Sequence, residues 1–540
     1  MIGPLGWTVV APLLCGILAL AVPVPRLARL LGLGGSLVPL VIGVVALSDF
    51  ARHPGADFRL QEFMPWSENF GIAWRAGVDG ISAAMLALAG LVTVVATLAA
   101  WHEARSPRLY HALVLLLLAA MCGVFVTLDF VVFYVCWEVM LVPMLALIGI
   151  YGGAQRRYAA LKFFVFTLAG SVLMLGLLLA LLPPSPRPDA ARSTTVQVAP
   201  ALLAACSTDQ GRTLHGLAVR DGSVSVPHSY DLRHLALQHA RWRQQPFLGT
   251  TLAWFGFLAL LLACLVKVPA VPLHTWLPHA HVQAPTAVSV LLAGVLLQLG
   301  VYGLYRIAWP LFPAEAAACA PWFGALGVLG ILWGAWVALG QSDWKRLVAY
   351  SSVSHMGFCL LGLAALTVAG AVGGMVQAVT HGLSSSLLFL LVGLVYERGH
   401  HRRLDGLGGL AQPMPRFAWI LLVAALASAG LPGLAGFVGE FMVLTGGFVA
   451  GPTFAWLSAA ATVSVVVSAG YLLWMVKRVA YGPLRQDAHA GLADCRPIEL
   501  AALLPLVVLI VVLGVWPAPL VDALRPACEA LILQVRSVVP

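Results

Sequence analysis

The sequence predicts an all-α integral membrane protein with about fourteen transmembrane helices. Of its 540 residues, 61% are hydrophobic and only 10% are charged, whereas a soluble globular protein is about 25% charged. The mean hydropathy is +0.93. The apolar residues form continuous runs rather than the alternating strands of an outer-membrane barrel, so we expect the spans to be helices.

The hydrophobic runs define the predicted spans. In chain order they cover 4–22, 30–48, 78–101, 109–128, 130–150, 157–182, 249–270, 285–309, 319–341, 346–366, 369–396, 417–448, 457–478 and 499–517. The first run lacks the basic segment of a secretory signal, so we expect it to be a span.

The loop charges predict the orientation of the chain. Alternate loops carry basic residues: Arg26 and Arg29; Arg105 and Arg108; Arg156 and Arg157; Lys345 and Arg346; Arg398, Arg402 and Arg403; and Lys477, Arg478 and Arg485. Short basic loops stay in the cytoplasm, which would place both termini outside. The net charge of +9 therefore follows from topology and does not indicate nucleic-acid binding. The two longer connections, 49–76 and 183–248, are expected on the outer face, because long loops cross largely regardless of charge.

Lys267 is the most informative charged residue, because it ends an apolar run and is followed by Pro269. A lysine at the bilayer centre costs about 2.5–3.5 kcal/mol on insertion scales, and a proline interrupts a helix. A charge beside a broken helix inside a membrane is typical of an ion or proton path. The alternative is a lysine that extends to the membrane surface.

Two carboxylates also lie at membrane depth. Glu138 has apolar residues on both sides along most of its span, and Glu440 follows a stretch in which Pro432 lies between glycines. A carboxylate in such a place is expected to face the protein interior, and Lys267 is the natural partner of Glu138. The glycines and Pro432 predict a break before Glu440, as in transporter ion sites. A hydroxyl partner for Glu138 and a simple packing kink near Glu440 are the alternatives.

Two histidines, His355 and His381, lie between these carboxylates and have serine neighbours. Imidazole both donates and accepts protons near neutral pH, which suits a relay, although a lone buried histidine is often structural. Lys162 is expected to extend to the cytoplasmic surface. Lys345 is also expected at that surface, next to Arg346.

The sequence does not predict a metal or redox site. The nine cysteines are scattered, without a C-x-x-C pair, which indicates neither a metal cluster nor disulfides. His274, His279 and His281 are close in sequence, but nothing else completes the ligand set of a catalytic metal.

Several blocks resemble the antiporter-like membrane subunits of respiratory complex I, and in particular the subunit M family of NADH-quinone oxidoreductase. They read KVPAVPLHTWLPHAHVQAPTAVSVLLAGVLLQLGVYG, FYVCWEVMLVPMLALIGIYGG, RYAALKFFVFTLAGS, WKRLVAYSSVSHMGF, ERGHHRRLDGLGGLAQPMP and LPGLAGFVGEFMVL. The resemblance extends from about residue 78 to 480. It fails at 183–228, which looks like an insertion.

The resemblance implies two inverted five-helix repeats, each with a broken helix. It divides the chain into an N-terminal pair of spans with an outer-face segment, the core of the first repeat, the polar loop with the insertion, the broken-helix region, the second repeat with the following span, and a connector with the last span and a C-terminal tail. These parts cover 1–76, 77–182, 183–248, 249–309, 310–480 and 481–540, respectively.

The resemblance also implies a function. Protons would move through Glu138 and Lys267, along His355 and His381, and leave at Glu440 toward the next subunit. No redox cofactor is implied in this chain, since NADH, FMN, Fe–S clusters and quinone belong to partner subunits. The implied neighbours are L-type and N-type antiporter-like subunits in a bacterial inner membrane.

The sequence departs from the family pattern at three positions. His279 and Gln283 replace acidic residues, and Gln298 replaces a lysine. Glutamine cannot take up a proton near neutral pH, so Gln298 is a candidate relay residue only through hydrogen bonding; Lys345 is a second candidate. The alternatives are a subunit of a related cation/proton antiporter or membrane-bound hydrogenase, and a structural spacer with impaired transport.

Overall fold

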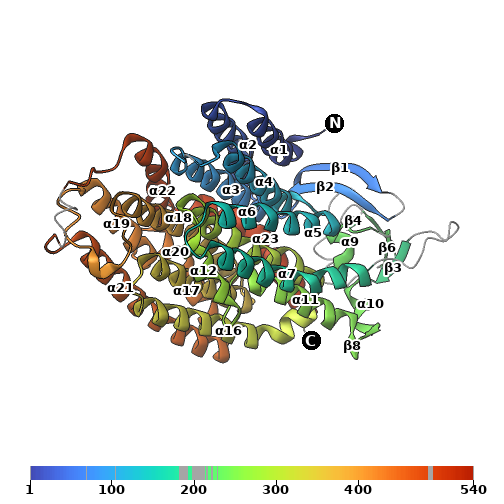
Figure 1. The fold of residues 1–540 in the computed structure, drawn as a ribbon. Coiled ribbons are helices and arrows are strands. Elements are labelled where there is room, and N and C mark those ends of the chain that lie inside the picture. Colours follow the sequence, from blue (N-terminus) through green and yellow to red (C-terminus); the bar gives the residue numbers. More distant parts are fainter. Residues whose placement is uncertain are drawn as a thin grey trace.

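The computed structural model describes residues 2–67, 70–103, 105–181, 193–197, 213–214, 217–220, 223–227, 229–484 and 491–538. Long helices pack side by side into an elongated bundle, and the strands gather at one end of it (Figure 1). The predicted helical class is confirmed, although the chain also contains short strands that the hydropathy pattern did not indicate.

Twelve segments of the described chain are long and apolar enough to cross a membrane. They are α1 Pro4–Ala21, α2 Pro25–Arg52, α3 Gly80–Ala99, α4 Pro107–Val126, α5 Phe130–Val139 with α6 Leu141–Tyr151, α7 Arg156–Ala180, α13 to α15 at Thr286–Leu311, α16 Pro313–Leu339, α17 Trp344–Ala364, α18 Val368–Gly399, α21 Pro452–Ala480 and α22 Pro497–Val515. Two further crossings are interrupted and contain the shorter apolar helices Leu252–Lys267, Pro415–Ser428 and Ala435–Phe448. Each of the predicted spans therefore corresponds to helix in the structure.

In the first of these crossings, the helix is interrupted directly after Lys267, as predicted. Helix α11 (Leu252–Lys267) ends there, and the chain becomes α-helical again only at α12 (Trp276–Gln283), after the 3₁₀ turn η1 (Leu273–Thr275). Pro269 and Pro272 lie in the gap and cannot donate helical hydrogen bonds, which explains why the helix stops.

The second interrupted crossing lies within the predicted span at 417–448. It consists of α19 (Pro415–Ser428) and α20 (Ala435–Phe448). Between them, Gly430 and Gly433 have φ angles of +73° and +91°, which residues other than glycine rarely adopt. The predicted break before Glu440 is therefore confirmed.

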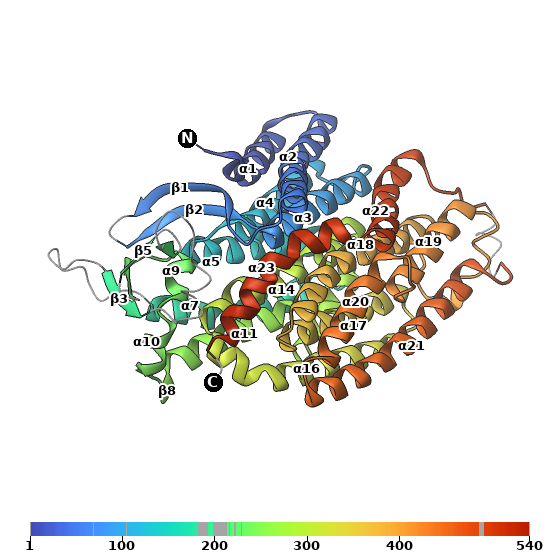
Figure 2. The ribbon, with the colours of Figure 1, turned by 180° about the vertical axis from the view of Figure 1, so that it is seen from behind.

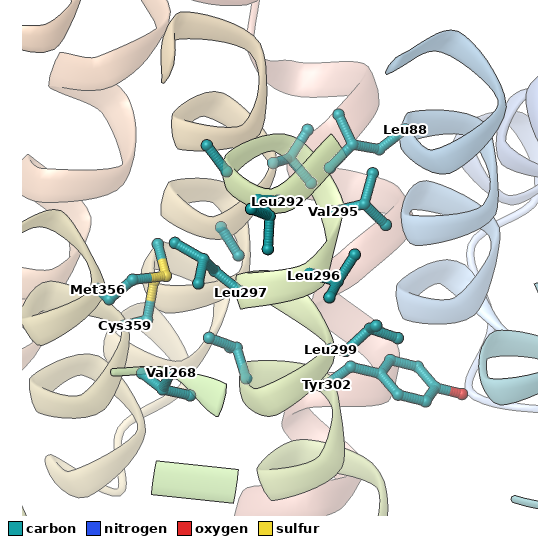
Figure 3. Close-up of a cluster of buried hydrophobic side chains, with 14 of the residues drawn as sticks. Leu88, Val268, Leu292, Val295, Leu296, Leu297, Leu299, Tyr302, Met356 and Cys359 are labelled. Atoms are coloured by element: carbon teal, nitrogen blue, oxygen red, sulfur yellow. The ribbon is translucent and has the colours of Figure 1, made fainter. Parts of the chain in front are cut away.

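The centre of the bundle is formed by α18 and by the segment from α13 to α15. In both, the most apolar 18-residue window is entirely buried. The second segment is α13 (Thr286–Leu291), α14 (Leu297–Gly303) and α15 (Trp309–Leu311), joined by π-helical turns η2 (Leu292–Leu296) and η3 (Leu304–Ala308). Figure 3 shows side chains of this segment packed between helices on both sides. Such π turns are often found at functional sites.

The connection at 49–76, for which the sequence predicted no secondary structure, contains most of a hairpin. Strands β1 (Arg59–Ser67) and β2 (Ile72–Val78) pair antiparallel. The described parts of the loop at 183–248 include a four-stranded sheet of order β3-β6-β5-β4, with β3 Ser193–Gln197, β4 Thr213–Leu214, β5 Leu217–Arg220 and β6 Ser223–Pro227. Helices α9 (Leu232–Ala236) and α10 (His239–Gln244) and the short pair β7 (Pro246–Phe247) and β8 (Thr250–Thr251) then lead into α11.

The C-terminal residues form a further helix where the sequence predicted only a tail. Helix α23 (Ala518–Arg536) runs across the bundle (Figure 2) and contacts α2, α3, α15, α16 and α18. Its buried face includes Leu524, Cys528 and Ile532. At Gly80, a Cβ atom would lie 1.7 Å from the carbonyl oxygen of Ala523, so only glycine permits this close approach.

Candidate functional site

Lys267 is buried at the end of α11, with 3% of its surface exposed. Its Nζ lies 3.6 Å from the centroid of the Trp137 indole ring. The same ammonium donates to the Trp137 carbonyl oxygen at 3.4 Å and contacts Met140 Sδ at 3.1 Å. Lys267 therefore does not extend to the membrane surface.

Glu138 lies on α5 beside a kink in the span. Helices α5 and α6 are separated at Met140, and Pro143 cannot donate to the carbonyl of Val139 one turn earlier. Glu138 Oε1 is buried and accepts no hydrogen bond from any described residue.

The expected partnership of Glu138 and Lys267 is electrostatic rather than a direct contact. The two charges interact, but their N and O atoms are more than 4.0 Å apart, since no ion pair joins them. The indole ring and the thioether of Met140 occupy the surroundings of the ammonium instead. Ser171 on α7 also interacts with the Glu138 carboxyl group.

A second polar cluster connects four helices in the middle of the bundle. Gln298 Nε2 on α14 lies 3.1 Å from His381 Nδ1 on α18. The ring of His381 lies 5.6 Å from that of His355 on α17, measured between centroids. His355 Nδ1 lies 3.0 Å from Glu440 Oε1 on α20. The structure thus brings together four of the predicted residues.

The helix break places Glu440 in this cluster. A Cβ atom on Gly430 would lie 2.8 Å from Glu440 Oε2, so the carboxylate lies against the gap between α19 and α20. The cluster also contains Gln377, which the sequence did not single out. Its Nε2 donates to Glu440 Oε1 at 3.3 Å and lies 3.4 Å from His355 Nδ1. Gln377 lies four residues, about one helical turn, before His381 on α18. This spacing puts the two side chains on the same helix face, and it was the sequence signal that could have identified Gln377.

Lys345 is not at the surface, which corrects the prediction made for it. It is 7% exposed, and its Nζ donates to the Ala284 carbonyl oxygen at 2.6 Å. The chain between α12 and α13 covers it, whereas the neighbouring Arg346 is exposed as expected. Lys345 also interacts electrostatically with His281, whose ring stacks on Phe389 at 4.3 Å.

The departures at 279 and 283 lie where α12 meets α7. Lys162 Nζ is 3.4 Å from His279 Nδ1, and Gln283 Oε1 accepts a hydrogen bond from the Gln155 backbone N–H at 3.0 Å. His274 is next to Tyr350, with ring centroids 6.1 Å apart. Among the described residues, no three His, Cys, Asp or Glu side chains are grouped to hold a metal ion.

A buried ion pair outside the predicted path was also missed. Arg306 Nη2 lies 2.6 Å from Asp79 Oδ1, and Tyr302 OH lies 2.9 Å from Ser82 Oγ. Asp79 also caps α3 by accepting from the Ser82 backbone N–H at 2.9 Å. An arginine inside an apolar run was the signal that the sequence offered.

Comparison with known proteins agrees with this architecture. The family model described as NADH:quinone oxidoreductase/Mrp antiporter, TM, matches residues 127–182 and 229–468. The chain belongs to this family. The residues that the family model leaves out between these two stretches coincide with the predicted insertion at 183–228.

Similar proteins within the family match nearly the whole chain. NADH-quinone oxidoreductase subunit M of Rhodobacter capsulatus is 37% identical over 94% of this chain and 91% of the relative. The subunit M of Pseudomonas aeruginosa is 38% identical over 96% and 95%. A chain in the structure of respiratory complex I from Thermus thermophilus with bound NADH has a TM-score of 0.79 and 31% identity, covering 98% of this chain and 99% of that one. The predicted family resemblance is confirmed.

Proposed function

We propose that this chain is a proton-translocating membrane subunit of an NADH-quinone oxidoreductase. Protons would move through Glu138 and Lys267 and then along Gln298, His381 and His355 to Glu440. The observation that carries the proposal is the buried contact series Gln298–His381–His355–Glu440, which joins two central helices to a helix break. Buried ionisable groups are costly in a membrane protein and are characteristic of ion paths.

The chemistry of each group suits its proposed role. Lys267 can hold a proton because the indole face stabilises its ammonium without a counter-charge in contact. Glu138 Oε1 accepts no other hydrogen bond from the described residues, so it can accept a proton. Imidazole rings both donate and accept, and the short contact of His355 with Glu440 permits direct transfer between them.

Lys345 would belong to the uptake side of this path. It lies near the basic end of α17, its charge interacts with His281, and His281 in turn interacts with His381. We therefore propose the order Lys345, His281 and His381 as a side branch into the central cluster.

We further propose that electron transfer takes place in partner subunits that hold NADH, FMN, Fe–S clusters and quinone. We also propose a bacterial inner membrane, with both termini extracytoplasmic because the short basic loops would lie in the cytoplasm. L-type and N-type subunits are the proposed neighbours. In keeping with this, the face beside Glu138 exposes Val135, Val139 and Val142, which lipid or another membrane helix can cover.

The decisive experiment is Glu138→Gln in the purified complex, reconstituted in vesicles. The proposal predicts that proton translocation is largely abolished while the complex assembles and oxidises NADH. Wild-type translocation by the variant would overturn the proposed path. Ser106→Ala, at a helix N-cap without a side-chain capping bond, is the control and should translocate normally.

A related antiporter-type complex is the second candidate, because the matching family model includes Mrp antiporters. Purification of the native complex separates the two functions. Co-purifying subunits with bound FMN and Fe–S clusters support the oxidoreductase, whereas Na⁺-dependent exchange in a complex without them supports the antiporter.

A further inference from the structure

Gln298 is completely buried near the start of α14, directly after the π turn η2, and its carboxamide has a defined orientation. Nε2 lies 3.1 Å from the Ala293 carbonyl oxygen and 3.1 Å from His381 Nδ1. A carbonyl oxygen only accepts hydrogen bonds, so the atom that faces Ala293 must be the amide nitrogen. The Ala293 carbonyl oxygen therefore fixes which way the amide of Gln298 is turned, without any need to know where its hydrogens lie.

The orientation of the amide determines the state of the histidine. The second N–H of the Gln298 amide points to His381 Nδ1, which must then be an acceptor and carry no proton. In a neutral imidazole the single proton consequently lies on Nε2. His381 Nε2 and Gln298 Oε1 are both buried and have no hydrogen-bond partner among the described residues, so nothing there favours the opposite arrangement.

We propose that Gln298 is a positioning residue that keeps His381 uncharged with its proton on Nε2, and that its carboxamide must turn over before His381 takes a second proton. This inference rests on the proposed function. A proton added to Nδ1 would face the N–H groups of the amide. Turning the carboxamide lets Oε1 accept from Nδ1–H, but it also brings Oε1 against the Ala293 carbonyl oxygen, where two acceptors meet.

The orientation of the carboxamide follows the proton on His381 Nδ1. With Nε2 toward Nδ1, the ring is neutral. With Oε1 toward Nδ1–H, the ring carries a proton on each nitrogen, and loss of either proton restores a neutral ring. The carboxamide returns to its first orientation only when Nδ1 is bare. The atoms balance without any group from outside the path.

The surroundings of His381 are consistent with such control. The groups that face it from other helices are Gln298 on α14, His355 on α17 and His281 on α12. Glu440 in turn contacts His355, and Lys345 interacts with His281. The neighbouring Leu296, Leu297 and Leu299 are buried and belong to an apolar cluster (Figure 3). In this setting one hydrogen bond has a large effect on the ring.

The test is a series at position 298 in the intact, reconstituted complex, with proton translocation measured against pH. Gln298→Met keeps the length of the side chain but removes the donor, so His381 should be protonated more readily. On the acid side of the profile (its acid limb), the pH at which translocation falls to half should rise by about one unit, the size expected for the loss of one hydrogen bond. Gln298→Glu should move it further, and Gln298→Lys, which still donates, should leave it at or below the wild-type position.

A matched control is available in the same chain. Gln341 Nε2 also donates to a backbone carbonyl, that of Val337, at 3.0 Å. Gln341→Met should leave the acid limb unchanged. If Gln298→Met does not assemble, the comparison of Gln298→Lys with Gln298→Glu tests the same order.

A second measurement separates this inference from the proposed path. Exchange of the C2 proton of the His381 ring, followed by mass spectrometry across pH, titrates that ring whether or not protons are translocated. The ordered shift should appear there too. An acid limb and a His381 titration that are the same in the wild type, Gln298→Met and Gln298→Glu would overturn the inference. Full translocation by Glu138→Gln would overturn only the proposed path.

Discussion

Lys267 and Trp137 form a buried cation–π contact, with Nζ 3.6 Å from the centroid of the indole ring. Glu138 follows Trp137 in the chain, but its carboxylate forms no ion pair with Nζ within 4.0 Å. The ammonium is therefore stabilised by an aromatic face and not by a contacting counter-charge. A proton can leave Lys267 without first breaking a salt bridge.

We predict that Trp137→Leu lowers the rate of proton translocation by at least tenfold. A desolvated cation–π contact contributes about 2 kcal/mol, and its loss makes the charged form of Lys267 less favourable. The measurement is the initial rate of proton movement into vesicles that contain the reconstituted complex.

The control for that prediction is Trp322→Leu. Trp322 is 80% exposed and lies on α16, away from Lys267, so its replacement should leave translocation unchanged. An unchanged rate in Trp137→Leu itself would show that the indole ring does not hold the transferring ammonium.

We predict that Glu440→Gln stops proton transfer from His355 while the complex still assembles. The amide can replace the carboxylate as a hydrogen-bond partner of His355 Nδ1, which lies 3.0 Å from Oε1, but it cannot take up a proton. Translocation should fall to a few per cent, with NADH oxidation in the uncoupled complex retained. Translocation at the wild-type rate would place the exit elsewhere.

Much of this site was predictable because charge inside an apolar run has few explanations. Lys267, Glu138 and Glu440 each stand out against a span that needs no polar group. The breaks after Lys267 and before Glu440 followed from proline and glycine, whose backbone limits are local. These features depend on sequence neighbours alone.

The parts that could not be predicted depend on contacts between distant segments. The burial of Lys345 results from the carbonyl of Ala284, about 60 residues earlier, and no local pattern indicates that contact. Gln377 is an ordinary polar residue until α17 and α20 pack beside it. The hairpin β1–β2 was missed because its exposed residues alternate only weakly, so its pairing with the rest of the chain decides its form.

We predict that Gly80→Ala destabilises the complex through α23. The added methyl group would lie 1.7 Å from the Ala523 carbonyl oxygen, so α23 has to move away from α3 and expose part of its buried face. Overpacking of this kind typically costs about 1–3 kcal/mol. Faster protease cleavage near the C-terminus and a lower unfolding temperature are the expected results.

Gly470→Ala is the matched control for this change. Among the described residues, no atom from outside the surrounding helical turns lies within 4 Å of a Cβ built at Gly470, which is inside helix α21. The same substitution there should leave stability unchanged or raise it slightly, because alanine favours helix more than glycine. Equal behaviour of the two variants would mean that α23 adjusts without cost.

Asp231, which lies outside the membrane-spanning helices, gives a prediction about pH. Its backbone forms an isolated antiparallel β-bridge with that of Asp129. Its carboxylate accepts two hydrogen bonds from the Arg233 guanidinium, at 3.0 and 2.7 Å. Burial alone raises the pKa of Asp231, but the hydrogen bonds and charge of Arg233, together with the charge of His234, outweigh burial and hold this pKa below its usual value.

A lowered pKa in the folded state means that this carboxylate stabilises the fold above its unfolded pKa of about 3.9. That contribution is lost as the pH falls below this value and through the folded pKa. We therefore predict that Asp231→Asn lowers stability at pH 7 by about 1.5–3 kcal/mol, the range for hydrogen bonds to a charged group. The difference from the wild type should shrink below about pH 4. Unfolding temperatures of the purified complex between pH 7 and pH 3 provide the measurement, with the exposed Asp57→Asn as the control; a difference that does not change with pH would contradict the assigned role of the Arg233 contact.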